Sequence, residues 1–72
     1  FTIFPNPAHD IIKIQSGKNY SEIQIFTTTG VQVSRYKRTL SDQYSITGLQ
    51  HGVYLVKLIG LNGSIVQKLF VE

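Results

Sequence analysis

The fold of this chain is decided by its last long stretch, GVYLVKLIGLNGSIVQKLFV, residues 52–71. Residues typical of strands flank Asn62-Gly63, a dipeptide preferred in type I′ hairpin turns because both central residues need positive φ. The stretch therefore predicts two antiparallel strands, 52–60 and 64–71. Since side chains alternate between the faces of a strand, Tyr54, Val56 and Leu58 are expected to point inward.

A turn centred on Asn62-Gly63 places residues whose numbers sum to 125 opposite one another. One face then pairs Tyr54 with Val71, Val56 with Leu69 and Leu58 with Gln67, and the other pairs Ile59 with Val66, Lys57 with Lys68 and Leu55 with Phe70. A different loop length would slide this register, and an odd shift would exchange the two faces.

Turn residues recur upstream at short intervals, at 5–7, 16–19, 29–30, 40–42 and 47–48. The runs between them are rich in β-branched and aromatic residues, and none has a sustained helical period. Seven strands are predicted, at 1–4, 10–16, 21–28, 31–37, 43–47, 52–60 and 64–71. This spacing indicates a single all-β domain, a compact immunoglobulin-like antiparallel β-sandwich.

The core must come from apolar burial alone, because the 72 residues include no cysteine and 42% are hydrophobic. Alternation places Ile12, Ile14, Ile23 and Ile25 on inward faces, with Lys13, Gln15, Glu22 and Gln24 outward. Ile46 and Leu49 are expected to close the core around the turn between them.

Nothing in the sequence has the pattern of a catalytic, cofactor or metal site. His9 and His51 are the only histidines and lie in no ligand-spaced cluster, and the acidic residues are scattered. The longest apolar run is residues 53–56, far below the roughly 20 residues of a membrane helix. The chain is therefore not expected to be an enzyme, to bind a cofactor or metal, or to span a membrane.

The only cluster of charge is Arg35-Tyr36-Lys37-Arg38, in a chain of net charge +3. It could form an anion-binding strip with Tyr36 as a stacking surface for a nucleic-acid base. The alternative is an exposed strand end on which cations prevent pairing with other strands. The second interpretation is favoured, because one tetrapeptide is a small electrostatic footprint.

Two short segments predict rigid local structure. Pro5 and Pro7 fix φ and remove two backbone donors, so strand pairing must stop at a corner in which the amide of Asn6 can bond to nearby backbone. Gly52 allows a tight turn into the strand that begins with Val53-Tyr54. Tyr54 is then placed to form a tyrosine corner, its hydroxyl bonding to upstream backbone.

Four segments together resemble the type A C-terminal sorting domain of the type IX secretion system. They are Phe4-Pro5-Asn6-Pro7-Ala8, Ile23-Gln24-Ile25-Phe26 with Gly30, the run from Leu49 to Lys57, and Gln67-Lys68-Leu69-Phe70-Val71. Thr27 departs from the family pattern, which more often has an aspartate three residues before the glycine.

The resemblance implies that residues 1–72 are the sorting domain of a larger exported protein, a fragment whose upstream part is missing. The cargo would cross the periplasm, and the outer-membrane translocon would recognise the folded domain. A surface sortase would remove the domain, at or before Phe1, as the cargo reaches the cell surface or is released. The isolated domain is expected to be a monomer that binds no nucleic acid. A carbohydrate- or matrix-binding sandwich is the alternative, although the chain has no tryptophan.

Partner recognition is assigned to two regions, the corner and the terminal hairpin. The expected residues are Pro5, Asn6, Pro7, Gly52, Tyr54, Lys57, Lys68 and Phe70. On the outer face of the hairpin, Lys57 and Lys68 are expected to lie directly opposite one another, where a partner carboxylate would relieve their repulsion. The alternative is that both lysines extend into water and the apolar residues around them pack elsewhere.

Overall fold

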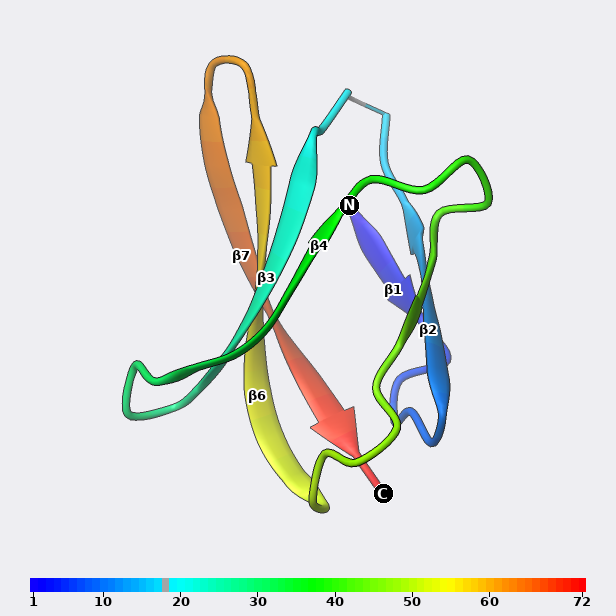
Figure 1. Ribbon diagram of the computed structural model, residues 1–72, viewed down its shortest axis with the longest axis vertical. Coiled ribbons are helices and arrows are strands. Elements are labelled where there is room, and N and C mark those ends of the chain that lie inside the picture. The colour runs from blue at the N-terminus through cyan, green and yellow to red at the C-terminus, as the bar shows by residue number, and fades with distance from the viewer. Residues whose placement is uncertain (18) are drawn as a thin grey trace.

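In the computed structural model, residues 1–17 and 19–72 are described, and they form seven strands and no helix (Figure 1). The strands are β1 (Thr2–Phe4), β2 (Ile11–Gln15), β3 (Glu22–Thr27), β4 (Gln32–Lys37), β5 (Gln43–Ser45), β6 (Gly52–Gly60) and β7 (Gly63–Val71). All seven predicted strands are confirmed, with ends within two residues of the predicted ones. Lys18, in the predicted turn 16–19, lies outside the described residues. Within those residues there is also no helix long and apolar enough to cross a membrane.

The strands form two antiparallel sheets that face one another as a sandwich (Figure 1). One sheet has the order β1-β2-β5 and the other the order β4-β3-β6-β7. In the immunoglobulin scheme these are strands A, B and E against C′, C, F and G, which confirms the predicted fold class.

The core lies between the sheets and follows the predicted alternation of faces. Ile12, Ile23, Ile25, Ile46, Val56 and Leu69 are its largest fully buried side chains. The predicted inward residues Tyr54, Val56 and Leu58 are all buried, and Leu49 packs against the core from its edge. Lys13 and Gln15 are exposed as expected.

The register of the terminal hairpin differs from the predicted one by two residues. Gly60 pairs with Gly63, so Leu61 and Asn62 are the central residues of the turn and the paired numbers sum to 123. Neither central residue has positive φ, which excludes a type I′ turn, whereas Gly63 has φ 135°. Because the shift is even, every side chain keeps its predicted face.

The turn between β3 and β4 shows how Thr27 replaces the aspartate that the family more often has. The Thr27 hydroxyl accepts a hydrogen bond from the amide of Val31 at 3.1 Å and bonds to the hydroxyl of Thr29 at 2.9 Å. The Thr27 carbonyl accepts from the amide of Gly30, which has φ 94°. The hydroxyl thus supplies the side-chain acceptor that an aspartate would offer in such a turn.

Candidate recognition surface

The Pro5-Asn6-Pro7 corner is fastened to the edge of β7 by one side chain. Asn6 Nδ2 donates to the carbonyl of Lys68 at 3.2 Å, and the amide of Phe70 donates to Asn6 Oδ1 at 3.0 Å. The carboxamide therefore pairs with the edge of the strand as a neighbouring backbone would. The prediction that Asn6 bonds to nearby backbone is wrong, because its backbone partners lie 62 and 64 positions away along the chain.

Residues on either side of the corner extend this contact. The amide of Ala8 donates to the carbonyl of Phe70 at 2.7 Å, and the amide of Glu72 donates to the carbonyl of Ala8 at 2.8 Å, so Ala8 and Val71 form a parallel bridge. At the other end, Gln67 Nε2 donates to the carbonyl of Phe1. The first eight residues thus follow β7 from Gln67 to its end.

Gly52 and Tyr54 shape the start of β6 behind this edge. Gly52 has φ 150°, in a region that favours glycine, and pairs with Val71. The Tyr54 hydroxyl donates to the carbonyl of Gln50 at 2.7 Å, which confirms the tyrosine corner. Because Tyr54 is only 9% exposed, it positions the strand rather than offering a surface.

The outer face of the hairpin carries Lys57, Lys68 and Phe70 among apolar neighbours. The observed register pairs Lys57 with Val66 and Lys68 with Leu55, so the expectation that the two lysines lie directly opposite is wrong. They are diagonal neighbours instead, a separation of about 7–8 Å between Cα positions in an antiparallel pair. Lys68 and Phe70 are exposed and Lys57 is half-buried. One carboxylate between the two ammonium groups remains geometrically feasible.

The basic run is occupied by contacts within the domain. Arg35 Nε and Nη2 donate to the Glu22 carboxylate at 2.7 and 3.1 Å, and these bonds, with one from Gln24, lower the pKa of Glu22. The Tyr36 hydroxyl donates to the carbonyl of Ser45 at 2.8 Å. Arg38 pairs with Asp42 at 3.0 Å. This favours a strand end held by its own ion pairs over an anion-binding strip.

Beneath Arg38 lies a polar network that the sequence did not reveal. The hydroxyl of buried Tyr20 donates to the Asp42 carboxylate and is 2.9 Å from the hydroxyl of Tyr44, while the Arg38 guanidinium lies 4.4 Å from the centre of the Tyr20 ring. Burial and these hydrogen bonds raise the pKa of Tyr20, and the bond from Tyr20 is the main cause of a lowered pKa for Asp42. The only sequence signal was a turn at 40–42, where Asp42 has φ 56°.

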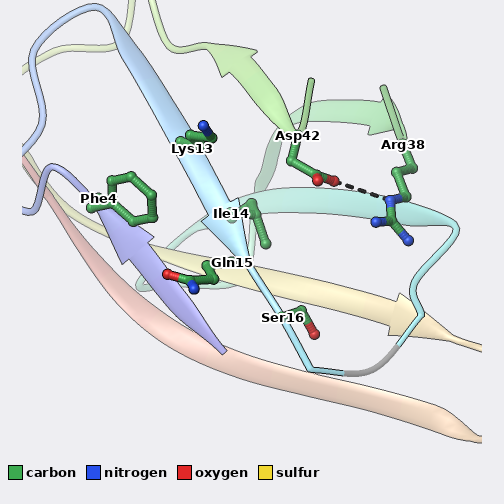
Figure 2. A pocket seen from close by; sticks show the side chains of 7 residues that line it. All are labelled: Phe4, Lys13, Ile14, Gln15, Ser16, Arg38 and Asp42. Atoms are coloured by element: carbon green, nitrogen blue, oxygen red, sulfur yellow. Dashed lines mark hydrogen bonds and ion pairs between the residues drawn. The ribbon is translucent and has the colours of Figure 1, made fainter. Parts of the chain in front are cut away.

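A shallow pocket of about 350 Å³ opens beside this network, between the ends of β1 and β2 and the 38–42 connection (Figure 2). Its lining residues are Phe4, Lys13, Ile14, Gln15, Ser16, Arg38 and Asp42. Figure 2 shows the Arg38–Asp42 ion pair at one side of the pocket. The pair neutralises the guanidinium of Arg38, which leaves Lys13 as the cation of the lining with no ion pair among the described residues.

Within residues 1–17 and 19–72, the side chains that could act as catalysts or metal ligands lie apart from one another. His9 and His51 are exposed and lie at separate turns. Across residues 1–17 and 19–72, no three His, Cys, Asp or Glu side chains are grouped so that they could hold a metal ion. The features that converge are an edge, a corner and an exposed sheet face, which together are typical of a protein that is recognised by another.

Comparison with known families agrees with this class. A family described as the secretion system C-terminal sorting domain matches residues 2–72. The chain belongs to this family, the C-terminal sorting domain of the type IX secretion system. No curated protein matches the chain.

Membership fixes the function of the domain. It is a C-terminal sorting signal for type IX secretion, which implies interaction with the secretion machinery, and a sorting signal is not itself a catalyst. Its cargo is secreted through the outer membrane to the cell surface or beyond. The carbohydrate- or matrix-binding alternative is not supported.

Proposed function

We propose that residues 1–72 form the single sorting domain of a larger exported protein, and that the outer-membrane translocon recognises this domain in its folded state. The cargo crosses the periplasm first, and a surface sortase then removes the domain at or before Phe1. The domain is a monomer with no enzymatic activity of its own. Its role at each step is that of a substrate.

The recognition surface comprises the corner and the outer face of the hairpin, with Pro5, Asn6, Pro7, Lys57, Lys68 and Phe70 in contact with the partner. Gly52 and Tyr54 hold the start of β6 in place behind this surface. The observation that supports the proposal is the double hydrogen bond of Asn6 to Lys68 and Phe70. It joins the two ends of the chain into one continuous patch that exists only in the folded domain.

The test is a fusion of residues 1–72 to the C-terminus of a fluorescent protein targeted to the periplasm, in a host with type IX secretion. We expect fluorescence at the cell surface or in the medium. A matched fusion with Val56→Asp places a charge at a fully buried position and should leave the reporter in the periplasm. Periplasmic retention of the unmodified, folded domain would contradict the proposal, and export of the unfolded variant would contradict recognition of the folded state.

Charge reversal on the outer face tests the contact residues. Lys57→Glu and Lys68→Glu should each block export while the domain stays folded, because neither lysine is buried and neither forms an ion pair among the described residues. Lys13→Glu, on the exposed face of the other sheet, is the matched control and should be exported normally. Normal export of both hairpin variants would confine the recognition surface to the corner.

A further inference from the structure

The four edge strands of the sandwich are protected to very different degrees. β1 and β5 have only three residues each, and β4 carries Arg35 and Lys37 together with a register shift opposite Ile25/Phe26. Short length, charge and irregular pairing are the means by which proteins keep sheet edges from pairing with other chains. β7 has nine residues and none of these features over its first half, GSIVQ, residues 63–67.

The backbone of this first half faces an open edge. In β7 the groups that bond to the corner belong to Lys68, Phe70 and Glu72, so the even-numbered residues point away from β6. By the same alternation the amides and carbonyls of Ser64 and Val66 point outward too. No residue in the described part of the chain bonds to them, because the first eight residues reach only as far back as Gln67.

The side chains around this edge are apolar on the inner face. Ile65 is 45% exposed although it lies on the face that is buried further along β7, because the hairpin tip extends past the strands of the other sheet (Figure 1). Below it a cavity of about 510 Å³ is lined by residues of the tip, by Tyr20 and Leu58, and by the polar residues Ser16 and Asn19. Leu61, at the turn, is 99% exposed.

On the outer face the same edge is basic. Val66 is 50% exposed and pairs with Lys57, and Lys68 is the next residue along β7 on that face. Neither lysine has an ion-pair partner within residues 1–17 and 19–72. A strand added beside Val66 would therefore place one row of side chains over the cavity, beside the apolar Leu61 and Ile65, and the other row near two unpaired ammonium groups.

From this we infer that residues 63–67 of β7 form a strand-addition site. The occupant is an extended segment of the export machinery with apolar side chains on one face and a carboxylate on the other. Addition would continue the pairing that Asn6 and Ala8 already make along the same edge, with main-chain hydrogen bonds supplying affinity and alternate side chains supplying specificity. The inference rests on the proposed function, since it names how the machinery contacts the domain.

The test removes one amide of β7 that points away from β6, and it leaves the hydrogen bonds between β6 and β7 in place. Val66→Pro removes one donor from the open edge, a position at which an edge strand tolerates proline. We expect secretion of the fluorescent fusion to fall by roughly tenfold, which corresponds to about 1.4 kcal/mol of binding free energy. Lys37→Pro is the matched control on the β4 edge, where the odd-numbered amides point outward, and should be secreted normally. Normal secretion of folded Val66→Pro, alongside a secreted unmodified fusion, would overturn the inference while leaving the proposed function intact.

A second measurement does not depend on the folding of the proline variant. A photo-crosslinking amino acid at Ser64, in the otherwise unmodified fusion, should form in cells a product with an outer-membrane component of the export system, identified by mass spectrometry. A crosslinked dimer of the fusion would instead make a second copy the occupant and would overturn the inference. The absence of any crosslink in cells that secrete the fusion would also overturn it.

Discussion

The carboxamide of Asn6 satisfies one donor and one acceptor on the edge of β7, and it does so on the surface of the domain. We expect Asn6→Ala to lower the free energy of unfolding by about 1–2 kcal/mol, since each lost bond is worth about 0.5–1.5 kcal/mol. Hydrogen exchange gives a more local measurement, because the amide of Phe70 loses its acceptor while the amide of Tyr54 does not. Unchanged exchange at Phe70 in Asn6→Ala would contradict the observed contact.

Tyr54 provides a second test at the scale of one residue. Tyr54→Phe removes the hydroxyl that donates to the carbonyl of Gln50 and should cost about 1 kcal/mol. In a domain of this size that is a fall in melting temperature of about 4–8 °C. Tyr36→Phe is the matched variant, since its hydroxyl also donates to a carbonyl but in an exposed position, where water can replace it. An equal or larger loss in Tyr36→Phe would show that burial does not strengthen the tyrosine corner.

The β6–β7 hairpin shows what can be predicted for a single element. The faces of both strands followed from alternation, which an even shift of register cannot change. The register itself did not follow, because Asn62-Gly63 matches a type I′ turn while Leu61-Asn62 occupies the centre. In the structure Gly60 pairs with Gly63 to close the two-residue turn, and a Cβ added at Gly60 would lie 3.0 Å from the carbonyl oxygen of Asn19.

Buried residues of the hairpin test its packing. Val56→Ala and Leu69→Ala remove side chains that are 0% exposed, and the cavities should cost about 2–4 kcal/mol. That is a large share of the total stability of a small domain. Val66→Ala, at a position half exposed on the outer face, should cost far less. Thermal or urea unfolding measures all three, and a Leu69→Ala domain as stable as the unmodified one would contradict the assignment of faces.

At the scale of the whole molecule, stability should depend on pH at both extremes. The pKa values of Asp42 and Glu22 lie below their usual values of 3.8 and 4.5, because Tyr20 and Arg35 respectively donate to the carboxylates. The stability that these two carboxylates contribute is complete above their usual pKa values and is lost as the pH falls through the lowered pKa values. The pKa of Tyr20 is raised by burial, so its contribution is present below its usual value of 10.0 and is lost as the pH rises above it.

Urea unfolding across the pH range measures this dependence. Asp42→Asn should flatten the acid side of the profile, whereas Asp10→Asn should not, because Asp10 is exposed and its carboxylate makes no bond within residues 1–17 and 19–72. Tyr20→Phe should flatten the alkaline side. If Asp42→Asn does not change how stability falls at acid pH, the Tyr20–Asp42–Arg38 network is not the cause of that fall.

The long-range contacts mark the limit of what the sequence reveals. Alternation and turn residues are local signals, and they were sufficient to predict the seven strands and the sandwich fold. Nothing local indicates that Asn6 bonds to Phe70, that Gln67 holds Phe1, or that Tyr20, Asp42 and Tyr44 meet, since these partners are brought together only by the packing of the two sheets. The sequence predicted both the corner and the hairpin as recognition sites, but it did not predict that the two lie together in one patch.

The contact between the corner and β7 joins residues that are synthesised at very different times. Asn6 leaves the ribosome long before Phe70, its partner 64 positions later. The corner therefore lacks its partners until Lys68 and Phe70 have been translated, and until then β6 and β3 have no β7 to complete their sheet. A polypeptide that stops early carries no finished sandwich. Loss of β7 would thus remove an edge strand of the four-stranded sheet and the partner of the corner at the same time.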